Sequence, residues 1–320
     1  MKILLVRLSS MGDLIHTLPA LSDLQRHRPD IELDWLTEAA FADIARLHPS
    51  VRAVKTLRWR QWRKTPFQAA VRRELAALRR DLQAERYDWV LDAQGLLKSA
   101  AFARFAGAPV YGLDGSSARE PLAALFYARR FAVEKGRDAV WRNRQLLAQA
   151  FGYTPDGAAD FGVVLPETAA VANLPSDYAV ALHASSRDSK LWPQNHWRDC
   201  LKRLHEHYGW TVYLPWGSET ERTRAEQLAQ DLPFVRVCPS MDLLQAAALL
   251  RGAQAVLGVD TGLLHLADAV GAPLVGIYTD SDPAKTGVQP SPRAVSLGGI
   301  GQIPSVDEVM QALVISFQAV

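Results

Sequence analysis

The sequence predicts an α/β protein made of two Rossmann-like domains, each built around a parallel sheet. Short β-rich runs alternate with helical patterns in both halves of the chain, which is typical of parallel strands joined by helical crossovers. A segment rich in Pro, Gly, Asp and small residues separates the two alternations, as interdomain connections often do. The length of 320 residues also exceeds what one hydrophobic core usually organises.

The composition excludes several classes of protein. With 48% hydrophobic and 22% charged residues, the chain resembles a folded globular protein rather than a disordered one. No apolar stretch approaches the roughly 18 residues of a membrane span, and the N-terminus lacks a signal-peptide cleavage pattern. Cys200 and Cys238 are far apart and have no C-x-x-C partner, so neither a disulfide framework nor a zinc site is indicated. We therefore expect a cytoplasmic protein.

The first domain is expected to span residues 1–160. Apolar residues at helical spacing follow Asp13, where we expect a helix to begin, and Pro19 should kink or tighten its early turns. Other elements expected here are strands at residues 2–8, 31–38 and 87–95 and a charged helix at residues 72–85.

Residues 161–177 are expected to form a linker, and residues 178–303 a second domain. Its expected strands lie near residues 178–185, 211–217, 235–239, 255–260 and 274–278, with helices at 197–208, 221–232, 243–250 and 263–270. Residues 304–320 should form a helix that packs back on the first domain. Two such domains would make a cleft between the carboxyl ends of their sheets, where ligands usually bind in open α/β folds.

The first candidate site is the turn Ser9-Ser10-Met11-Gly12-Asp13 after the first strand. Small residues there let the backbone approach a ligand, and the Asp13 carboxylate would project into the cleft. A purely structural role for Asp13, in capping the helix, is equally compatible with this position. The turn is not a dinucleotide fingerprint, because G-x-G-x-x-G is absent.

The second candidate site is the segment from Gly258 to His265, where a strand ends and a helix begins. Unpaired backbone N–H groups at a helix start bind anions, and a diphosphate is the obvious ligand. Asp260 or Thr261 could instead be a simple N-cap, and His265 a packed histidine.

Two further segments of the second domain carry groups suited to a nucleotide. The loop that begins at Ser185 also contains Ser186 and Lys190. The two hydroxyls and the ammonium group suit phosphate oxygens. Glu221 follows a strand at a place where a carboxylate commonly accepts from a ribose hydroxyl. A solvated loop and an ordinary surface charge are the alternatives for these segments.

Asp280-Ser281-Asp282 has the D-x-D spacing that many nucleotide-sugar enzymes use to hold a divalent cation. It runs directly into Pro283, so we interpret it as turn chemistry. His205 and His207 are two residues apart on an expected helix and therefore lie on different faces. No metal site is predicted.

Positive charge is concentrated locally. The formal net charge is only +2, but residues 58–86 contain nine Lys/Arg and three acids, and the stripe LRWRQWRK interleaves cations with Trp59 and Trp62. Such a stripe suits a solvated helical face, anionic lipid headgroups or RNA, and the sequence does not choose among them.

Five segments taken together resemble glycosyltransferase family 9. They are VRLSSMGDLIHTLPAL, LDAQGLLKSA, REPLAALFY, SRDSKLWP and GVDTGLLHLADAVGAP, in family order over nearly the whole chain. The resemblance implies a GT-B fold, with transfer of L-glycero-D-manno-heptose from ADP-heptose to the Kdo residue of Kdo-lipid A. It also implies inversion at the anomeric carbon, no cofactor and no essential metal. The enzyme would be a monomer at the cytoplasmic face of the inner membrane, without a nucleic-acid partner.

Residue roles follow from the same resemblance. Asp13 matches the catalytic carboxylate, which would take the proton of the acceptor hydroxyl. Donor-binding positions match Ser185, Ser186, Lys190, Glu221, Asp260, Thr261, Gly262, Leu263 and His265, and serines stand at 185 and 186 where threonines are frequent. Acceptor-binding positions match Ser10, Gly12, Arg60, Arg63, Lys64 and Arg119, and this mapping is less regular for the stripe. Domain closure would join the two half-sites and exclude water.

Three alternatives stay open from the sequence. A family member that adds the second heptose would share the fold and the donor, although SRDSKLWP and MGDLIHTLPA favour the enzyme that adds the first. A sugar-nucleotide epimerase can have the same fold. A nucleic-acid-binding protein would explain the Arg/Trp stripe.

Overall fold

The computed structural model describes residues 1–171 and 173–317, with side chains described up to residue 314. The chain forms two compact units, Met1–Val164 and Leu165–Val320, so the division falls inside the segment 161–177. Within the described residues, each unit contains one six-stranded sheet whose strands all pair in parallel.

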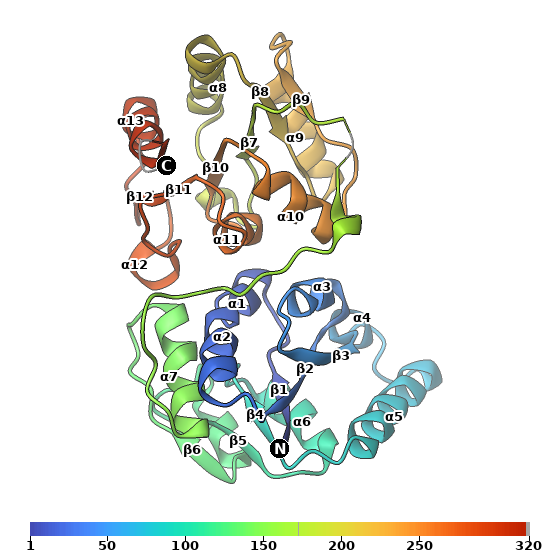
Figure 1. The fold of residues 1–320 in the computed structure, drawn as a ribbon. Coiled ribbons are helices and arrows are strands. Elements are labelled where there is room, and N and C mark those ends of the chain that lie inside the picture. Colours follow the sequence, from blue (N-terminus) through green and yellow to red (C-terminus); the bar gives the residue numbers. More distant parts are fainter. Residues whose placement is uncertain (172, 318–320) are drawn as a thin grey trace. The chain divides into compact units, whose positions relative to one another are not determined.

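The sheet of the first unit has the strand order β3-β2-β1-β4-β5-β6 (Figure 1). Its strands are β1 (Lys2–Val6), β2 (Glu32–Glu38), β3 (Val51–Leu57), β4 (Trp89–Asp92), β5 (Val110–Leu113) and β6 (Arg129–Phe131). The central strand β1 pairs with β2 on one side and β4 on the other, with Ile3 opposite both Leu33 and Trp89. The order of strands along the sheet changes direction between β1 and β4, and we call this place the reversal point. The loops that follow these two strands form the crevice in which open α/β sheets usually bind ligands.

Helices cover both faces of this sheet. They are α1 (Met11–Ile15), α2 (Leu18–His27), α3 (Ala42–Arg46), α4 (Trp59–Trp62), α5 (Ala69–Ala84), α6 (Leu97–Ala103) and α7 (Ala139–Phe151). On one face, Leu4 and Val6 of β1 pack in one cluster with Leu82 of α5 and Phe102 of α6. On the other face, α2 packs against α7. The side chains of a strand alternate between faces, so β1 supplies both cores.

The helix expected to begin at Asp13 begins two residues earlier, at Met11, because Ser10 is its N-cap. Pro19 is the second residue of α2, a position that tolerates proline because its N–H would have no helical partner. The predicted apolar stripe is therefore divided between α1 and α2.

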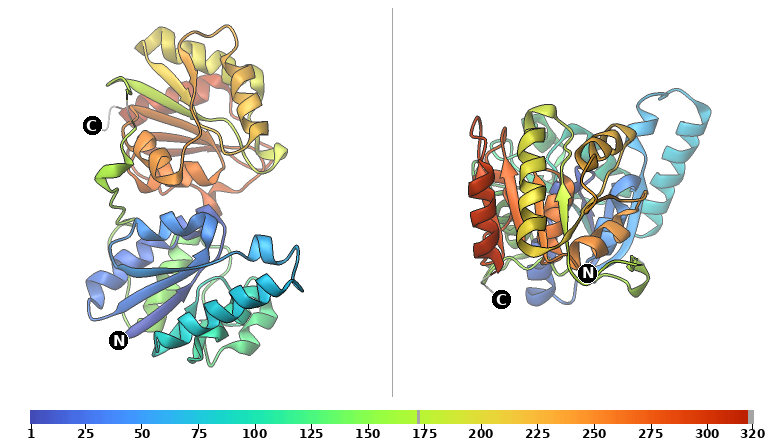
Figure 2. Two further views of the ribbon diagram at one scale, coloured as in Figure 1. Left: turned by 90° about the vertical axis from the view of Figure 1, so that its right-hand side faces the viewer. Right: turned by 90° about the horizontal axis from the view of Figure 1, so that it is seen from above.

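The second unit repeats the topology of the first, with strand order β12-β11-β10-β7-β8-β9 (Figure 1; Figure 2 shows the same ribbon from two further directions). Its strands are β7 (Tyr178–Leu182), β8 (Thr211–Leu214), β9 (Val235–Val237), β10 (Ala255–Val259), β11 (Leu274–Tyr278) and β12 (Ala294–Gly298). Its helices are α8 (Gln194–Tyr208), α9 (Glu219–Ala229), α10 (Leu243–Arg251), α11 (Gly262–Ala269), α12 (Pro283–Thr286) and α13 (Val306–Phe317). The reversal point lies here between β7 and β10.

The C-terminal helix contributes its apolar face to the core of the second unit. Val309 and Leu313 of α13 are fully buried in the core of the second unit, in one cluster with Trp197 of α8 and Ile277 of β11. The Trp192 indole also donates to the Pro304 carbonyl (2.8 Å), just before the helix begins. The apolar face of α13 therefore completes the core of its own unit.

No helix among the described residues has the length and apolar character needed to cross a bilayer.

Candidate functional site

The candidate residues of the first unit gather at the carboxyl edge of its sheet, around the reversal point. Ser10, Gly12 and Asp13 follow β1, while Gln94 and Lys98 follow β4. Gln94 joins the two loops, since its Oε1 accepts from the Leu8 amide (2.8 Å) and its Nε2 donates to the Ser9 carbonyl (3.1 Å). The topology thus brings together segments that lie more than 80 residues apart.

Asp13 is the third residue of α1, and its carboxylate caps that helix. Its Oδ2 accepts hydrogen bonds from both the backbone N–H and the hydroxyl of Ser10, at 2.8 Å each. Its Oδ1 lies 3.7 Å from a guanidinium nitrogen of Arg7. The capping role that the sequence left open is therefore present. Because the side chain is 32% exposed, a ligand can still reach the carboxylate.

The environment of Asp13 keeps it ionised. Burial alone would raise its pKa, but the Arg7 charge and the two Ser10 hydrogen bonds outweigh that effect and hold the pKa below its ordinary value. A carboxylate with this protonation state can accept a proton at neutral pH.

One arginine, Arg7, lies beside this carboxylate, and two further arginines lie close to Arg7. Arg7 is almost buried and donates to the Ala93 carbonyl and to the Asp13 carbonyl (3.4 Å). Burial lowers the pKa of Arg7, and repulsion from Arg119 contributes, so Arg119 lies near the Asp13 loop. Burial, followed by repulsion from Arg7, likewise lowers the pKa of Arg142 on α7. These charges make the crevice suitable for an acidic ligand.

Sequence reasoning missed three basic residues of this cluster. Arg7 and Lys98 lie inside segments that carry the family resemblance, but neither has a telling neighbour in sequence. Arg142 donates to the Ser117 carbonyl (2.8 Å), while its Nε is buried without a hydrogen-bond partner among the described residues. Only the fold brings Arg142 to the edge formed by β1 and β4.

The stripe around Arg60, Arg63 and Lys64 exposes its cations, while its tryptophans pack against the core. These three cations are exposed, whereas Trp62 is buried and its indole donates to Glu74 (2.8 Å). Trp59 packs edge-on against Phe102 of α6, at 5.6 Å between ring centroids. The alternation of Arg and Trp is therefore an amphipathic helical turn, with its tryptophans in the core.

Arg60 lies close to the carboxyl edge of the sheet. Its backbone N–H donates to Glu38 (3.1 Å), the last residue of β2, and its guanidinium lies over the Phe41 ring at 4.9 Å. Among the described residues, no hydrogen bond or ion pair joins Arg60, Arg63 or Lys64 to Asp13.

In the second unit, a polar cluster is centred on Asp260, the residue after β10. Its Oδ2 accepts from Lys190 Nζ and Ser281 Oγ, both at 2.6 Å, and its Oδ1 lies 3.6 Å from His265 Nε2. Ser185, which follows β7, donates to the Asp260 carbonyl (2.9 Å). The loops on either side of the second reversal point therefore meet at this residue.

The charges around Asp260 determine its ionisation. Burial would raise its pKa, but hydrogen bonds from His265, Lys190 and Ser281 hold the pKa far below its ordinary value. His265 is buried beside Asp260, within the predicted donor site.

The N-terminus of α11 begins beside this cluster. Thr261 is its N-cap residue, and the Thr261 side chain makes no capping hydrogen bond. The first backbone N–H groups of a helix, here those of Gly262 and Leu263, have no partner inside the helix and carry the positive end of its dipole. Together with Lys190 and Ser185, they form a cradle chemically suited to a diphosphate.

The other predicted donor residues lie apart from Asp260. Ser186 is exposed in the loop before Lys190. Glu221 accepts from the Gly217 amide (2.7 Å), close to the carboxyl end of β8. The sequence missed Ser281 and Thr279, of which the second donates to the Ser189 carbonyl (2.9 Å). Both residues follow the buried strand β11, which pairs with β10. Polar residues directly after a buried strand are the signal that could have identified them.

The D-x-D segment forms a helix cap. Asp282 is the N-cap of α12 and accepts from the Ala284 amide (3.0 Å), which is the turn chemistry predicted from the sequence. Among the described residues, no group of three or more His, Cys, Asp or Glu side chains is placed to hold a metal ion.

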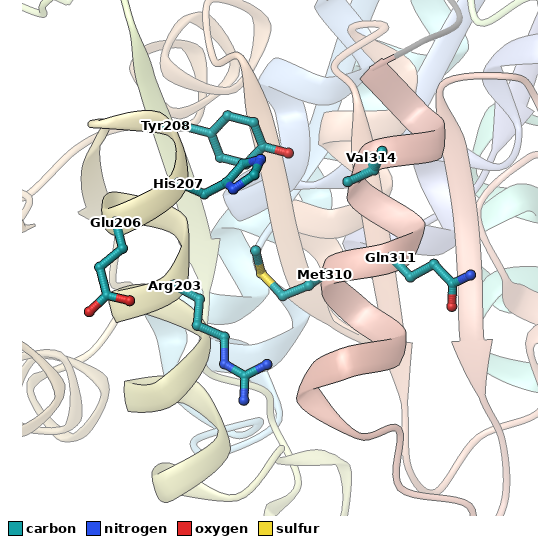
Figure 3. Close-up of a pocket in the computed structure, with 7 residues that line it drawn as sticks. All are labelled: Arg203, Glu206, His207, Tyr208, Met310, Gln311 and Val314. Atoms are coloured by element: carbon teal, nitrogen blue, oxygen red, sulfur yellow. The ribbon is translucent and has the colours of Figure 1, made fainter.

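A pocket in the second unit lies between α8 and α13 (Figure 3). Its volume is about 460 Å³, and its described lining residues are Arg203, Glu206, His207, Tyr208, Met310, Gln311 and Val314. None of these was predicted as a site residue, and they lie on helices rather than on the loops at the carboxyl edge.

The sequence of the chain is similar to those of known heptosyltransferases. Residues 75–312 match the model of glycosyltransferase family 9 (heptosyltransferase). The chain is 44% identical over 292 residues to lipopolysaccharide heptosyltransferase 1 of Escherichia coli (strain K12), covering 90% of each chain.

Solved structures of heptosyltransferases also resemble this chain. The E. coli heptosyltransferase WaaC with ADP superposes with a TM-score of 0.88 at 40% identity, over 97% of this chain and 98% of that one. The E. coli ADP-heptose heptosyltransferase II has a TM-score of 0.80 over 100% and 99% of the two chains. At 21% identity, the second match speaks for the fold alone.

Proposed function

Because this chain belongs to glycosyltransferase family 9, the heptosyltransferase family, we propose that its first unit deprotonates a sugar acceptor while its second unit holds the diphosphate of ADP-heptose. The chain is a heptosyltransferase of the type that adds the first heptose to lipopolysaccharide, the activity for which its 44% identical relative is named. The observation that carries the division of roles is chemical. An ionised carboxylate lies at one reversal point, and a cationic cradle at a helix N-terminus lies at the other.

The proposed reaction is a single displacement. Asp13 removes the proton from a Kdo hydroxyl as its oxygen bonds to the anomeric carbon of the heptose. The bond from that carbon to the β-phosphate oxygen breaks, so ADP leaves with its electron pair and the anomeric configuration inverts. The proton on Asp13 then passes to solvent.

The second unit stabilises the leaving group. Charge develops on the β-phosphate as the glycosidic bond breaks, and Lys190 with the N–H groups of Gly262 and Leu263 would neutralise it. In this proposal, the Lys190 ammonium exchanges its contact with Asp260 Oδ2 for one with phosphate, or bridges the two. Glu221 would accept from the ribose, and Ser185 and Ser186 would donate to phosphate oxygens. Because cationic groups already serve this charge, we expect no essential metal and full activity in EDTA.

The first unit would bind Kdo-lipid A, an acidic and amphipathic acceptor. Arg60, Arg63, Lys64 and Arg119 are proposed to contact its carboxylates and phosphates, with Ser10 and Gly12 near the reacting hydroxyl. Such an acceptor resides in a bilayer, so we propose that the enzyme works as a monomer peripherally bound to the cytoplasmic face of the inner membrane.

The other sequence alternatives are less well supported. Transfer of the second heptose is disfavoured because the solved heptosyltransferase II is only 21% identical. Nucleic-acid binding is disfavoured because Trp62 is buried and Trp59 packs edge-on against Phe102, so both tryptophans serve the core of the first unit.

The direct test is incubation with ADP-heptose and deacylated Kdo-lipid A, followed by mass spectrometry. A product one heptose heavier than the acceptor is expected. Transfer only to an acceptor that already carries one heptose would assign the chain to the second step. ADP-heptose recovered as an isomer without transfer would indicate an epimerase.

A further inference from the structure

An exposed apolar surface lies on the first unit, on elements that the proposed reaction does not use. The 3₁₀ helix η3 (Pro121–Phe126) has Leu122 and Leu125 exposed by 61% and 69%, while Ala123 and Ala124 are buried. Residues at i and i+3 of a 3₁₀ helix lie directly above one another, so the two leucines share one face. Phe126 and Leu97 are 42% and 40% exposed. We call these four side chains, Leu97, Leu122, Leu125 and Phe126, the η3 surface.

The η3 surface combines Leu97 of α6 with three residues of η3, and hydrogen bonds join these two elements. The Glu120 carboxylate accepts from the Leu97 backbone N–H at 2.7 Å, and the Glu120 backbone N–H donates to the Gly95 carbonyl at 3.0 Å. These bonds join the start of η3 to the start of α6, and the two helices pack together. The apolar groups are therefore held at the surface by the fold.

Positive charge surrounds these apolar groups. The Arg104 guanidinium lies 6.0 Å from the centre of the Phe126 ring, Arg119 is exposed just before η3, and Arg130 is exposed just after it. Residues 96–131 contain five Lys/Arg and two acids. Both acids are used within the fold, Glu120 by Leu97 and Asp114 by Ser116 and Ser117. An apolar centre with a cationic border is the pattern that suits an anionic membrane surface.

The η3 surface also borders the catalytic crevice. Leu97 belongs to it, while the next residue, Lys98, reaches back to the Ser9 hydroxyl (3.4 Å) in the Asp13 loop. The η3 surface therefore begins one residue from a side chain that contacts the loop where the acceptor sugar is proposed to react.

We propose that the η3 surface docks the enzyme on the anionic bilayer that contains its acceptor, with Leu122, Leu125, Phe126 and Leu97 entering the interface and Arg104 and Arg130 contacting lipid phosphates. The amphipathic acceptor is part of the proposed function, and the docking surface rests on it. A second copy of the chain fits less well, because a two-fold contact would bring the same arginines against each other.

The test is flotation of the full-length protein with vesicles of phosphatidylethanolamine and phosphatidylglycerol, without acceptor. Leu122→Ser/Leu125→Ser should lower the apparent vesicle affinity about tenfold or more, because two exposed leucines lose their transfer into the interface. The matched control is Ile300→Ser/Ile303→Ser, which removes two side chains exposed by 69% and 56% in the second unit, and it should bind as the wild type does. Arg104→Gln/Arg130→Gln should weaken binding to these vesicles and reduce its salt dependence.

Two activity measurements separate this proposal from the proposed function. With deacylated acceptor in solution, Leu122→Ser/Leu125→Ser should keep the wild-type rate. With acylated acceptor in vesicles, its rate should fall in parallel with binding. Absence of transfer by the wild type to either acceptor would refute the proposed function, while the acceptor-free flotation would still report on the surface.

Three results would overturn the docking proposal. One is vesicle binding by the leucine variant that equals the wild type, and another is an equal loss in the Ile300/Ile303 control. The third is a wild-type dimer in sedimentation velocity that the leucine variant converts to monomer, since this would assign the η3 surface to self-association. If the double variant fails to melt like the wild type, Leu125→Gln alone provides the same comparison.

Discussion

The ammonium group of Lys190 lies 2.6 Å from Oδ2 of Asp260, so the lysine proposed to bind phosphate is held beside the helix N-terminus that would bind the same phosphate. Asp260 thereby positions Lys190 before any nucleotide arrives, which lowers the entropy cost of binding. The pairing leads to the first prediction.

Lys190→Ala should weaken ADP binding about 10- to 100-fold, the usual loss for a hydrogen bond to a charged group. Titration calorimetry with ADP measures this effect. Lys202→Ala, an exposed lysine on α8 of the same unit, serves as the control and should bind ADP normally. Wild-type affinity in the Lys190 variant would remove this residue from the donor site.

Asp13→Asn should separate catalysis from capping. The asparagine carbonyl can still accept from Ser10, so the thermal melt should stay near that of the wild type. An amide cannot take the acceptor proton, so kcat should fall roughly 10²- to 10⁴-fold.

The chain itself provides a matched control for that substitution. Ser305 donates to Glu308 Oε2 through its N–H (2.7 Å) and its hydroxyl (2.8 Å), the same arrangement at the start of α13. Glu308→Gln should therefore disturb a cap equally and leave kcat unchanged. Comparable turnover in the Asp13 and Glu308 variants would show that Asp13 is only a cap.

Neutralising Arg60, Arg63 and Lys64 together should raise the acceptor KM and leave the donor KM nearly unchanged. The reason is that these exposed cations belong to the first unit, whereas the diphosphate cradle belongs to the second. Arg72, Arg79 and Arg80, exposed on α5, provide a control of equal charge. A rise in donor KM would mean that the roles of the two units are assigned wrongly.

Protonation of Asp13 should not lower the transfer rate at neutral pH. Its folded pKa lies below its ordinary value, so the base is ready throughout the range above about pH 5. The same shift means that Asp13 adds stability above its unfolded pKa and loses it as pH falls through the folded pKa. The pH dependence of kcat/KM reports the pKa values of the unbound enzyme. A fall in kcat/KM of the wild type below about pH 6–7 that is absent in Asp13→Asn would contradict the lowered pKa of Asp13.

The fold was predictable where buried strands form continuous apolar runs, as in β1, β7 and β10. Strands β3, β5, β6 and β12 were missed. In the edge strands β3 and β6, exposed charges such as Arg52 and Arg129 interrupt the apolar pattern. An edge strand has one unpaired side, where charged residues hinder aggregation and hide the strand signal.

The candidate site was predictable only where its residues lie next to each other in the sequence. Asp13 and the segment Asp260–His265 follow strands directly, and local pattern indicates them. Arg142 comes from α7, and Ser281 from a segment interpreted as a turn, so only the sheet order places them beside Arg7 and Asp260. No spacing rule links residues that long-range strand pairing brings together.

Each sheet takes its strands from its own unit, and this has a consequence for biosynthesis. The first sheet ends with β6 at Phe131, and α7 ends at Phe151, before Leu165 begins the second unit. The N-terminal unit can therefore fold on the ribosome while the C-terminal unit is still being translated. A nascent chain stalled well beyond residue 164 should already resist a protease.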